Sequence, residues 1–286
     1  MSYKDVLVVF TSQQSPQARL QVAIDIARRD EAHLVGLYVI PPISLLAGGL
    51  PYTGGAAEVQ ALEQIQAMGR STALAEASRV EAAFQDQSAR ASLSTEWRVV
   101  EGPVTETVVL HARYSDLAVL GQSDPEHPAP GGAHLVETVL LGSGRPTLVV
   151  PYAGRFAQAG RYVLVAWNPT REAARAVNDA MPILVKAEIV TVLSVNPRSD
   201  TGERATWWPA VDITHHLARH GVVAEASSTV TDEIDVGNAI LSRAADLGSD
   251  LIVMGGYGHS RARELILGGV TRTLLEHMTV PVLLSH

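Results

Sequence analysis

The chain alternates short apolar runs with amphipathic stretches, and it does so in two successive halves. Unbroken runs of Val, Leu and Ile are typical of buried parallel strands, which need helices on both faces of their sheet. The spacing predicts five strands per half, at 4–10, 33–39, 94–100, 116–121 and 146–150, then at 162–167, 188–195, 222–228, 250–255 and 280–284. Helical periodicity predicts helices between them, among others at 16–27, 57–90, 170–180 and 207–219.

The two halves repeat the same segments in the same order. Asp5-Val-Leu-Val-Val-Phe10 matches Tyr162-Val-Leu-Val-Ala-Trp167, and Asp116-Leu-Ala-Val-Leu-Gly121 matches Asp250-Leu-Ile-Val-Met-Gly255. Internal repetition of this kind indicates a duplicated structural unit. We therefore expect an α/β protein with two tandem domains, each a five-stranded parallel sheet with helices on both faces. The expected domains are 1–153 and 160–286, joined by a linker near 151–160 that carries proline and glycine.

Glycines mark the most informative segment of the second half. The apolar run Leu251–Met254 ends at Gly255, and Gly258, Gly268 and Gly269 follow before a stretch of helical spacing begins. Glycines between a strand and a helix let backbone N–H groups approach an anion beside the helix N-terminus. This pattern predicts a phosphate cradle.

The lysine content excludes one kind of phosphate site. The only lysines are Lys4 and Lys186, and neither follows a glycine. A P-loop requires a lysine directly after its last glycine, so the chain is not a P-loop NTPase.

Taken together, the repeat and the glycines resemble the universal stress protein family, in particular its tandem two-domain members. Gly255, Gly258 and Gly268 satisfy the family's G-x2-G-x9-G-[ST] nucleotide signature, except at its last position, where Gly269 stands in place of Ser or Thr. The resemblance covers nearly the whole chain. It implies Rossmann-like (adenine nucleotide alpha hydrolase-like) domains, and a family in which some members bind ATP and others do not.

The resemblance also implies a set of binding residues in the second half. Backbone groups of the glycines would hold phosphates, Thr271 could add a hydroxyl, and residues at the ends of the first, second and fourth strands would flank the base and ribose. The candidate residues are Ala166, Asn168, Val195, Met254, Gly255, Gly258, His259, Gly268, Gly269, Val270 and Thr271.

Four positions bear on this implication. Gly269 lacks the hydroxyl that the family places there, and the loss of one hydrogen bond costs ~1 kcal/mol, or more to a charged acceptor. Asn168 stands where many nucleotide-binding members carry Asp. His259 and Arg261 could each donate to a phosphate, or could simply be exposed to solvent. Glycines at these spacings also serve tight crossover loops, so a structural role remains open.

The first half lacks the equivalent glycines. Gly121 is followed by a segment with three prolines and two acids, Asp124 and Glu126, which would repel an anion, and Thr11 replaces the carboxylate of the first strand. We expect this half to be a degenerate copy that binds no nucleotide and packs against the second half as an intramolecular pseudo-dimer. A homodimer of whole chains is also open.

Composition limits the other function classes. The 286 residues carry a net charge of −8 and no cysteine, which argues against nucleic-acid binding and excludes disulfides and thiolate chemistry. The N-terminus has no signal-peptide layout, and no apolar run reaches the ~20 residues that a membrane helix needs. We expect a cytoplasmic protein without a membrane partner.

Other motifs give weaker hypotheses. Arg261 breaks a dinucleotide fingerprint, and no G-x-S-x-G elbow surrounds Ser123. His216 and His220 are spaced as metal ligands on one helix, but no acidic residue at HExxH spacing accompanies them, so we expect an exposed helix face and no metal site. The 41–55 segment can be a lid or a plain loop, and Trp207-Trp208 can mark an interface, a ligand pocket or packing against the sheet.

The preferred hypothesis is a tandem stress protein that binds ATP, with or without Mg²⁺, in its second half and has a stress-response or regulatory role. It would catalyse at most slow ATP hydrolysis. The alternative is an interaction or oligomerisation module whose nucleotide site is vestigial, and a different small ligand between the halves is a third class.

Overall fold

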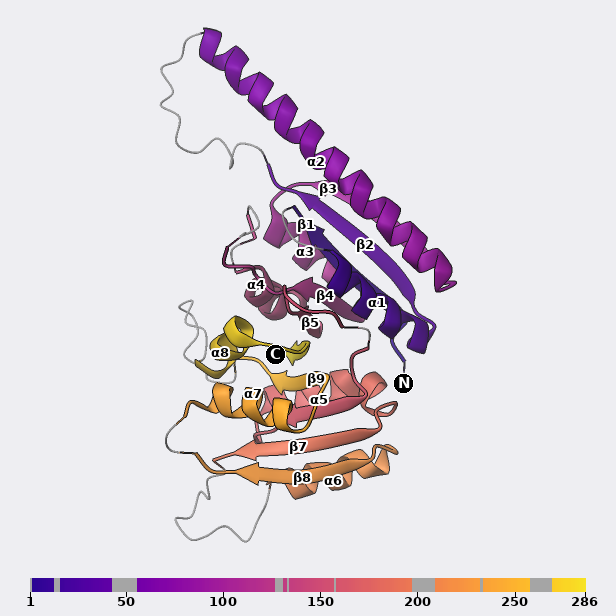
Figure 1. Ribbon diagram of the computed structural model, residues 1–286, viewed down its shortest axis with the longest axis vertical. Helices are drawn as coiled ribbons and strands as arrows, with labels where there is room; N and C mark the ends of the chain where they lie inside the picture. The colour runs from indigo at the N-terminus through magenta and orange to yellow at the C-terminus, as the bar shows by residue number, and fades with distance from the viewer. Residues whose placement is uncertain are drawn as a thin grey trace.

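A computed structural model describes residues 2–12, 16–42, 56–126, 131–132, 134–156, 158–196, 209–231, 234–257 and 269–286. In these residues, ten strands form one continuous sheet in the order β3-β2-β1-β4-β5-β10-β9-β6-β7-β8 (Figure 1). The strands of the first half are β1 (Asp5–Thr11), β2 (His33–Ile40), β3 (Thr95–Glu101), β4 (Leu117–Gly121) and β5 (Thr147–Val150). Those of the second half are β6 (Tyr162–Ala166), β7 (Ile189–Val195), β8 (Ala224–Thr229), β9 (Leu251–Gly255) and β10 (Val282–Ser285).

The two halves are copies of one arrangement. Each contributes five parallel strands, and the order 3-2-1-4-5 of the first half reappears as 8-7-6-9-10 in the second. The halves meet where β5 and β10 pair antiparallel, with Leu148 opposite Leu283. Antiparallel pairing of equivalent strands is the contact that a two-fold axis would give between two copies. The pseudo-dimer is therefore a single sheet that runs through both halves.

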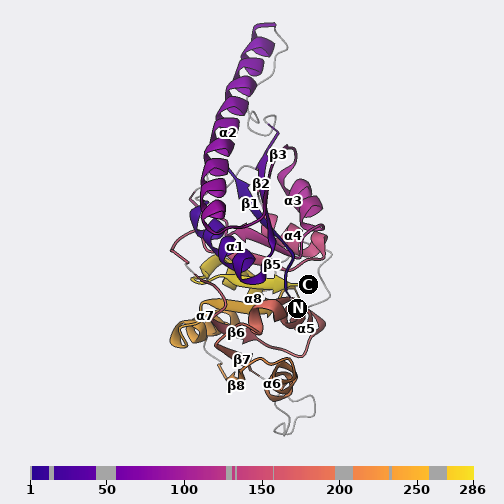
Figure 2. The ribbon, with the colours of Figure 1, turned by 90° about the vertical axis from the view of Figure 1, so that its right-hand side faces the viewer.

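Helices cover both faces of the sheet, as the apolar strands require (Figures 1 and 2). One face carries α1 (Gln17–Asp30), α2 (Ala56–Arg90), α5 (Arg171–Leu184) and α6 (Pro209–Arg219). The other carries α3 (Val104–Ala112), α4 (Leu135–Ser143), α7 (Val236–Asp246) and α8 (Gly269–His277). Strand residues alternate between the two faces, so that Val6 and Val8 pack under α1 whereas Leu7 and Val9 pack on the α3 side.

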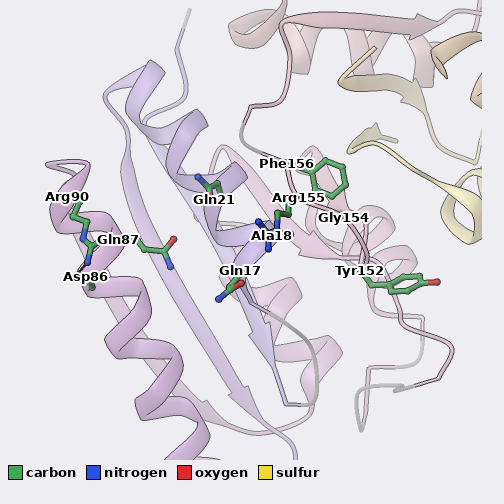
Figure 3. Close-up of a pocket in the computed structure, with 10 residues that line it drawn as sticks. All are labelled: Gln17, Ala18, Gln21, Asp86, Gln87, Arg90, Tyr152, Gly154, Arg155 and Phe156. Atoms are coloured by element: carbon green, nitrogen blue, oxygen red, sulfur yellow. Dashed lines mark hydrogen bonds and ion pairs between the residues drawn. The ribbon is translucent and has the colours of Figure 1, made fainter. Parts of the chain in front are cut away.

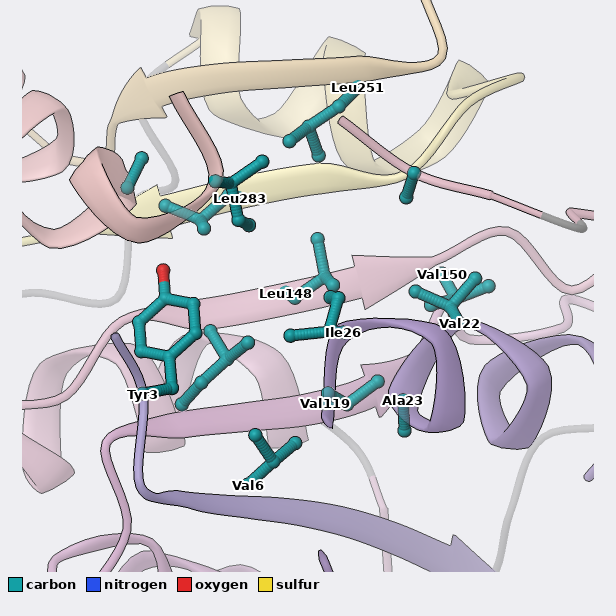
Figure 4. Close-up of a cluster of buried hydrophobic side chains, with 14 of the residues drawn as sticks. Tyr3, Val6, Val22, Ala23, Ile26, Val119, Leu148, Val150, Leu251 and Leu283 are labelled. Carbon is teal, nitrogen blue, oxygen red and sulfur yellow. The ribbon is translucent and has the colours of Figure 1, made fainter. Parts of the chain in front are cut away.

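Apolar and polar contacts join the halves on the α1 face (Figure 4). Leu148 and Leu283 lie at the centre of a buried cluster to which both halves contribute. The Tyr3 hydroxyl donates to the carbonyl oxygen of Asp179 at 2.7 Å. Lys186 pairs with the buried Asp30 carboxylate, with 2.8 Å between Nζ and Oδ1. Lys186, one of the two lysines of the chain, thus forms an ion pair between the two halves.

Sequence patterns predicted the strands better than the helices. All ten predicted strands are present, and their bounds differ by at most two residues. The predicted helix ends at 27 and 180 were wrong, because α1 continues to Asp30 and α5 continues through Pro182 to Leu184. Pro182 lies inside α5, where it removes one backbone hydrogen bond, and the helix ends two residues later. The segment 43–55 and Trp207-Trp208 lie outside the described residues.

Within the described part of the chain, no helix combines the length and apolar character of a membrane span.

Candidate functional site

The candidate site lies at the carboxyl ends of β6 and β9, which are neighbours in the sheet. From β6 the chain passes to α5 on one face, whereas from β9 it passes to α8 on the other. Two parallel strands whose connections leave to opposite faces open a crevice between them, and open α/β sheets bind their ligands there. The strand order alone therefore indicates the ends of β6 and β9 as the position where this fold would bind a ligand.

Four of the candidate residues lie on the α8 face of the sheet in the second half. Ala166 and Met254 are register partners on β6 and β9. Val195 at the end of β7 and Val270 in the first turn of α8 lie on the same face of the sheet, in the apolar core that this face shares with α7 and α8. Met254 is buried, and the other three are partly buried. These side chains are the apolar candidates at the carboxyl ends of β6, β7 and β9 and at the start of α8.

Asn196, which follows Val195 at the end of β7, has a local structural role. Its side chain donates to the carbonyl oxygen of Thr231 at 2.9 Å and accepts from the Thr231 N–H at 2.8 Å. These two bonds hold the ends of β7 and β8 together. The backbone of Asn196 itself is left-handed, with φ of 47°. Asparagine tolerates this conformation better than most residues.

The N-terminus of α8 begins at Gly269. A Cβ atom placed on Gly269 would meet no atom of the described residues within 4 Å, and the residue is exposed. The first turn of α8 holds no acidic residue. Its N–H groups carry the positive end of the helix dipole and have no partner further back in the helix. A phosphate group fits these features. Thr271, predicted to offer a hydroxyl, is buried in the described structure.

Gly255 is required by packing as well as by the predicted cradle. A Cβ on Gly255 would lie 2.5 Å from the backbone nitrogen of Ala173 and 2.6 Å from the carbonyl carbon of Glu172. The first turn of α5 thus rests directly on the end of β9, and any other residue would push the helix away. The buried Glu172 carboxylate, paired with the exposed Arg171, lies at the same contact.

Asn168 forms part of the turn that starts α5. Its Oδ1 accepts from the Thr170 hydroxyl at 2.9 Å, and the Thr170 Oγ1 in turn accepts from the Ala173 N–H at 3.3 Å. Thr170 is the N-cap of the helix. Asn168 is exposed and follows the end of β6, at the edge of the sheet where the crevice opens.

Three further candidates, Gly258, His259 and Gly268, lie outside the described residues, as does Arg261.

Sequence patterns gave no role to Tyr257, which follows the paired glycines. It has a left-handed backbone, with φ of 61°, and a buried side chain. Its hydroxyl has no hydrogen-bond partner among the described residues. Burial, and secondarily the charge of Glu137 in the first half, raises the pKa of Tyr257. The preceding Gly256 lies so near α4 that a Cβ would come within 2.7 Å of Leu140 Cδ2. The glycine loop is therefore in contact with the first half, a relation that no local pattern signals.

The equivalent point of the first half is filled differently. Arg19 in the first turn of α1 is buried, donates to the carbonyl oxygen of Val9 at 2.9 Å and lies 5.7 Å from the centre of the Phe10 ring. Burial lowers the pKa of Arg19 to about 10. The described residues here, among them Gly121, Gln122 and Asp124, enclose a cavity of only about 70 Å³.

The histidines of α6 do not assemble a metal site in the described structure. The rings of His216 and His220 are 4.8 Å apart, but no group of three or more His, Cys, Asp or Glu side chains among the described residues could hold a metal ion.

Comparison with known proteins agrees with the repeat and the sheet. Residues 161–286 match the model of the universal stress protein family. No curated protein matches the sequence. A universal stress protein from Archaeoglobus fulgidus DSM 4304 is similar in structure over 98% of this chain and 95% of that chain, with a TM-score of 0.72 and 16% identity. A protein of unknown function from Pseudomonas aeruginosa PAO1 matches over 99% of this chain and 92% of that chain, with a TM-score of 0.58 and 14% identity. The TM-scores and the coverage of this chain show that the fold is shared across both halves. Residues 161–286 therefore match the universal stress protein family, and the whole chain has a tandem arrangement of two Rossmann-like α/β halves.

Proposed function

We propose that this protein binds ATP or a related adenine nucleotide at the crevice between β6 and β9, as a regulatory ligand in a stress response. The observation that supports this most is the α8 N-terminus, which begins at the open position of Gly269 beside the switch point of the sheet. The adenine ring would pack against Ala166, Val195 and Met254, and the phosphates would accept from backbone N–H groups at Gly269, Val270 and Thr271.

We propose further that the second half alone binds the nucleotide. Small-molecule pockets occupy about 300–1,000 Å³, whereas the described cavity at the equivalent point of the first half measures about 70 Å³. Arg19 and Gln122 fill the space, and Asp124 adds a negative charge at its rim. Each of these side chains opposes a bound nucleotide, the first two by their volume and the third by its charge.

Mg²⁺, if present, would enter with the phosphates. This ion usually keeps several waters and takes few protein ligands in nucleotide sites, which suits a site built mainly from backbone N–H groups. We propose at most slow ATP hydrolysis, because binding through backbone groups positions the phosphates without activating a water.

Calorimetric titration of the full chain with ATP and Mg²⁺ tests the proposal. We expect saturable heat at one site per chain and a raised melting temperature. No heat at high protein concentration, together with an unchanged melting temperature, would contradict nucleotide binding and favour the alternative of an interaction module with a vestigial site. The absence of a hydroxyl at Gly269 is the observation on which that alternative rests. Nucleotide released from the denatured protein and identified by mass spectrometry would count against it.

Two further parts of the proposal concern the location of the protein and its oligomeric state. We propose a cytoplasmic location and allow for a homodimer in addition to the intramolecular pairing. Light scattering after size-exclusion chromatography measures the second: a single-chain mass of 30.5 kDa would contradict a stable dimer.

A further inference from the structure

Two features of the described surface lie away from the nucleotide crevice. One is a cavity of about 750 Å³ between α1, the C-terminal part of α2 and the segment that follows β5 (Figure 3). Its walls combine three glutamines with the Asp86–Arg90 ion pair, a set that suits many polar molecules and selects none. The other is the outer edge of β8, which ends the sheet at the side opposite to β3 (Figure 1). This edge has a fixed order of backbone donors and acceptors, so it specifies its partner more closely than the cavity does.

Three residues of β8 turn both backbone groups away from β7. The carbonyl oxygens of Val223 and Thr229 accept hydrogen bonds of 2.9 Å from β7. Direction alternates along a strand, so the odd-numbered residues face β7, whereas Ala224, Ala226 and Ser228 face outward. Among the described residues, no strand pairs with this outer side of β8. An edge of this kind is a template for a further strand.

The edge of β8 lacks the devices by which proteins usually block such pairing. It contains no proline, lysine or glycine, and most of its side chains are small. Its one charged side chain, Glu225, bonds inward, because its Oε1 accepts from the Thr191 hydroxyl on β7 at 2.9 Å. By contrast β3, the equivalent edge of the first half, carries Glu96, Arg98 and Glu101. Charged side chains are a common protection of an edge strand, so β8, and not β3, is suited to a partner strand.

We propose that a second copy of this chain pairs antiparallel with β8 and continues the sheet across a two-fold axis. The chain already uses this kind of joint internally, where β5 and β10 pair antiparallel. A two-fold axis keeps each face of the sheet on the same side. Residues that lie opposite one another must therefore share a face, and one residue of β8 must lie on the axis.

Ser227 suits the axis by hydrogen bonding and by charge. With Ser227 opposite its own copy, the outward N–H and C=O groups of Ala226 meet those of Ser228 in the other copy. The two Glu225 side chains are then four residues apart along the strands, whereas a centre at Ala226 would bring them within two residues and increase their repulsion. Val230, 76% exposed just beyond β8, comes opposite the start of the other copy's β8. This register pairs the outward backbone groups, covers an apolar side chain and separates like charges.

Oxidative cross-linking of Ser227→Cys tests the interface and its register. The chain has no cysteine, so this variant carries a single thiol. Residues opposite one another in a non-hydrogen-bonded pair have Cα atoms ~4.5 Å apart, which is within the ~4.4–6.8 Å that a disulfide spans. We expect a disulfide-linked dimer of Ser227→Cys. Ser228→Cys, whose two copies would stand two residues apart, is the matched control and should give little cross-link.

Light scattering after size-exclusion chromatography measures the same contact without a cross-link. The wild type should approach twice the 30.5 kDa of one chain as its concentration rises. Ala226→Pro removes an outward N–H group and breaks no bond to β7, so it should weaken dimerisation roughly tenfold. Val99→Pro is the matched change on β3, where Val99 also faces outward because the Ser94 carbonyl accepts from β2. It should leave the dimer unchanged, and the melting temperature checks that both variants fold.

Three results would overturn the proposal. One is a single-chain mass for the wild type at every concentration, which would leave the β8 edge to an extended segment of another protein or to no partner. Another is that Ala226→Pro folds and dimerises as the wild type does, which would place the contact elsewhere. A third is that Ser227→Cys cross-links no faster than Ser228→Cys. This interface is independent of the nucleotide crevice, because β7 separates β8 from β6, so failure here would leave the proposed function untouched.

Discussion

Gln122 joins the two halves through a single buried side chain, and its replacement tests whether the halves are held by specific contacts. The residue follows β4 and is 5% exposed. Its Nε2 donates to the carbonyl oxygens of Leu275 at 2.8 Å and Glu276 at 3.3 Å, in the last turn of α8. Its Oε1 accepts from the Tyr152 N–H at 3.2 Å. Gln122 thus caps a helix of the second half while fixing the chain segment that follows β5.

The cost of replacing Gln122 by Leu follows from these three bonds. Each ordinary hydrogen bond contributes about 1 kcal/mol net, and a buried group left without a partner costs about 1–3 kcal/mol. The carbonyl of Leu275 and the N–H of Tyr152 lose well-placed partners, whereas the bond to Glu276 is long and contributes little. Burial of the more apolar Leu side chain offsets part of this lost free energy. We expect Gln122→Leu to lower the free energy of unfolding by about 2–3 kcal/mol.

Urea denaturation followed by circular dichroism measures this change, with Gln85→Leu on the exposed surface of α2 as the matched control. The control should stay within about 0.5 kcal/mol of the wild type. Because the lost contact joins the halves, calorimetry of Gln122→Leu should also resolve two thermal transitions more clearly than in the wild type. A change below about 0.5 kcal/mol for Gln122→Leu would refute the reasoning, since it would mean that water or another group replaces these bonds at no cost.

Other contacts give further tests. Lys186→Met leaves the Asp30 carboxylate, whose side chain is 2% exposed, without its cation, and should destabilise the protein by roughly 3 kcal/mol in urea denaturation; adding Asp30→Asn should recover much of the loss, and equal stability of all three chains would contradict a structural ion pair. Gly36→Ala places a Cβ 2.5 Å from Cε3 of Trp97 and 3.0 Å from Cε2 of Phe84, so it should lower the free energy of unfolding by about 1–3 kcal/mol. An unchanged melting temperature of Gly36→Ala would show that the Trp97 ring moves aside freely.

The strands could be predicted because each is a buried apolar run with a clear end. Their arrangement was only partly open to prediction. Leu148 and Leu283 lie in short apolar runs that are buried on both faces of the sheet. The sequence pattern of such a run is the same whether two sheets pack face to face or join at their edges. The repeat indicated paired halves, but the antiparallel joint between β5 and β10 emerges only from the folded chain.

The candidate site shows the same limit at the level of single residues. From the family resemblance, the sequence predicted candidate residues at the strand ends, among them Ala166, Val195 and Met254. It did not reveal that Gly255 is in close contact with Ala173, since that contact joins segments about 80 residues apart. Arg19 reads as an ordinary polar helix residue, yet it is buried at the equivalent point of the first half. Long-range contacts of this kind have no local signature.

The central claim is that the N-terminus of α8 binds the phosphates of an adenine nucleotide, and a substitution series at Gly269 tests it most directly. A Cβ at this position meets no described atom within 4 Å, so we expect Gly269→Ala to bind ATP as the wild type does. Gly269→Ser adds a hydroxyl and should tighten ATP binding about fivefold, the equivalent of one net hydrogen bond. Gly269→Pro keeps the helix, because proline suits its first position, but removes an N–H group and should weaken binding roughly tenfold. Calorimetric ATP affinities in the order Ser, Ala, Pro are the predicted result, and equal affinities for all three variants would contradict the account.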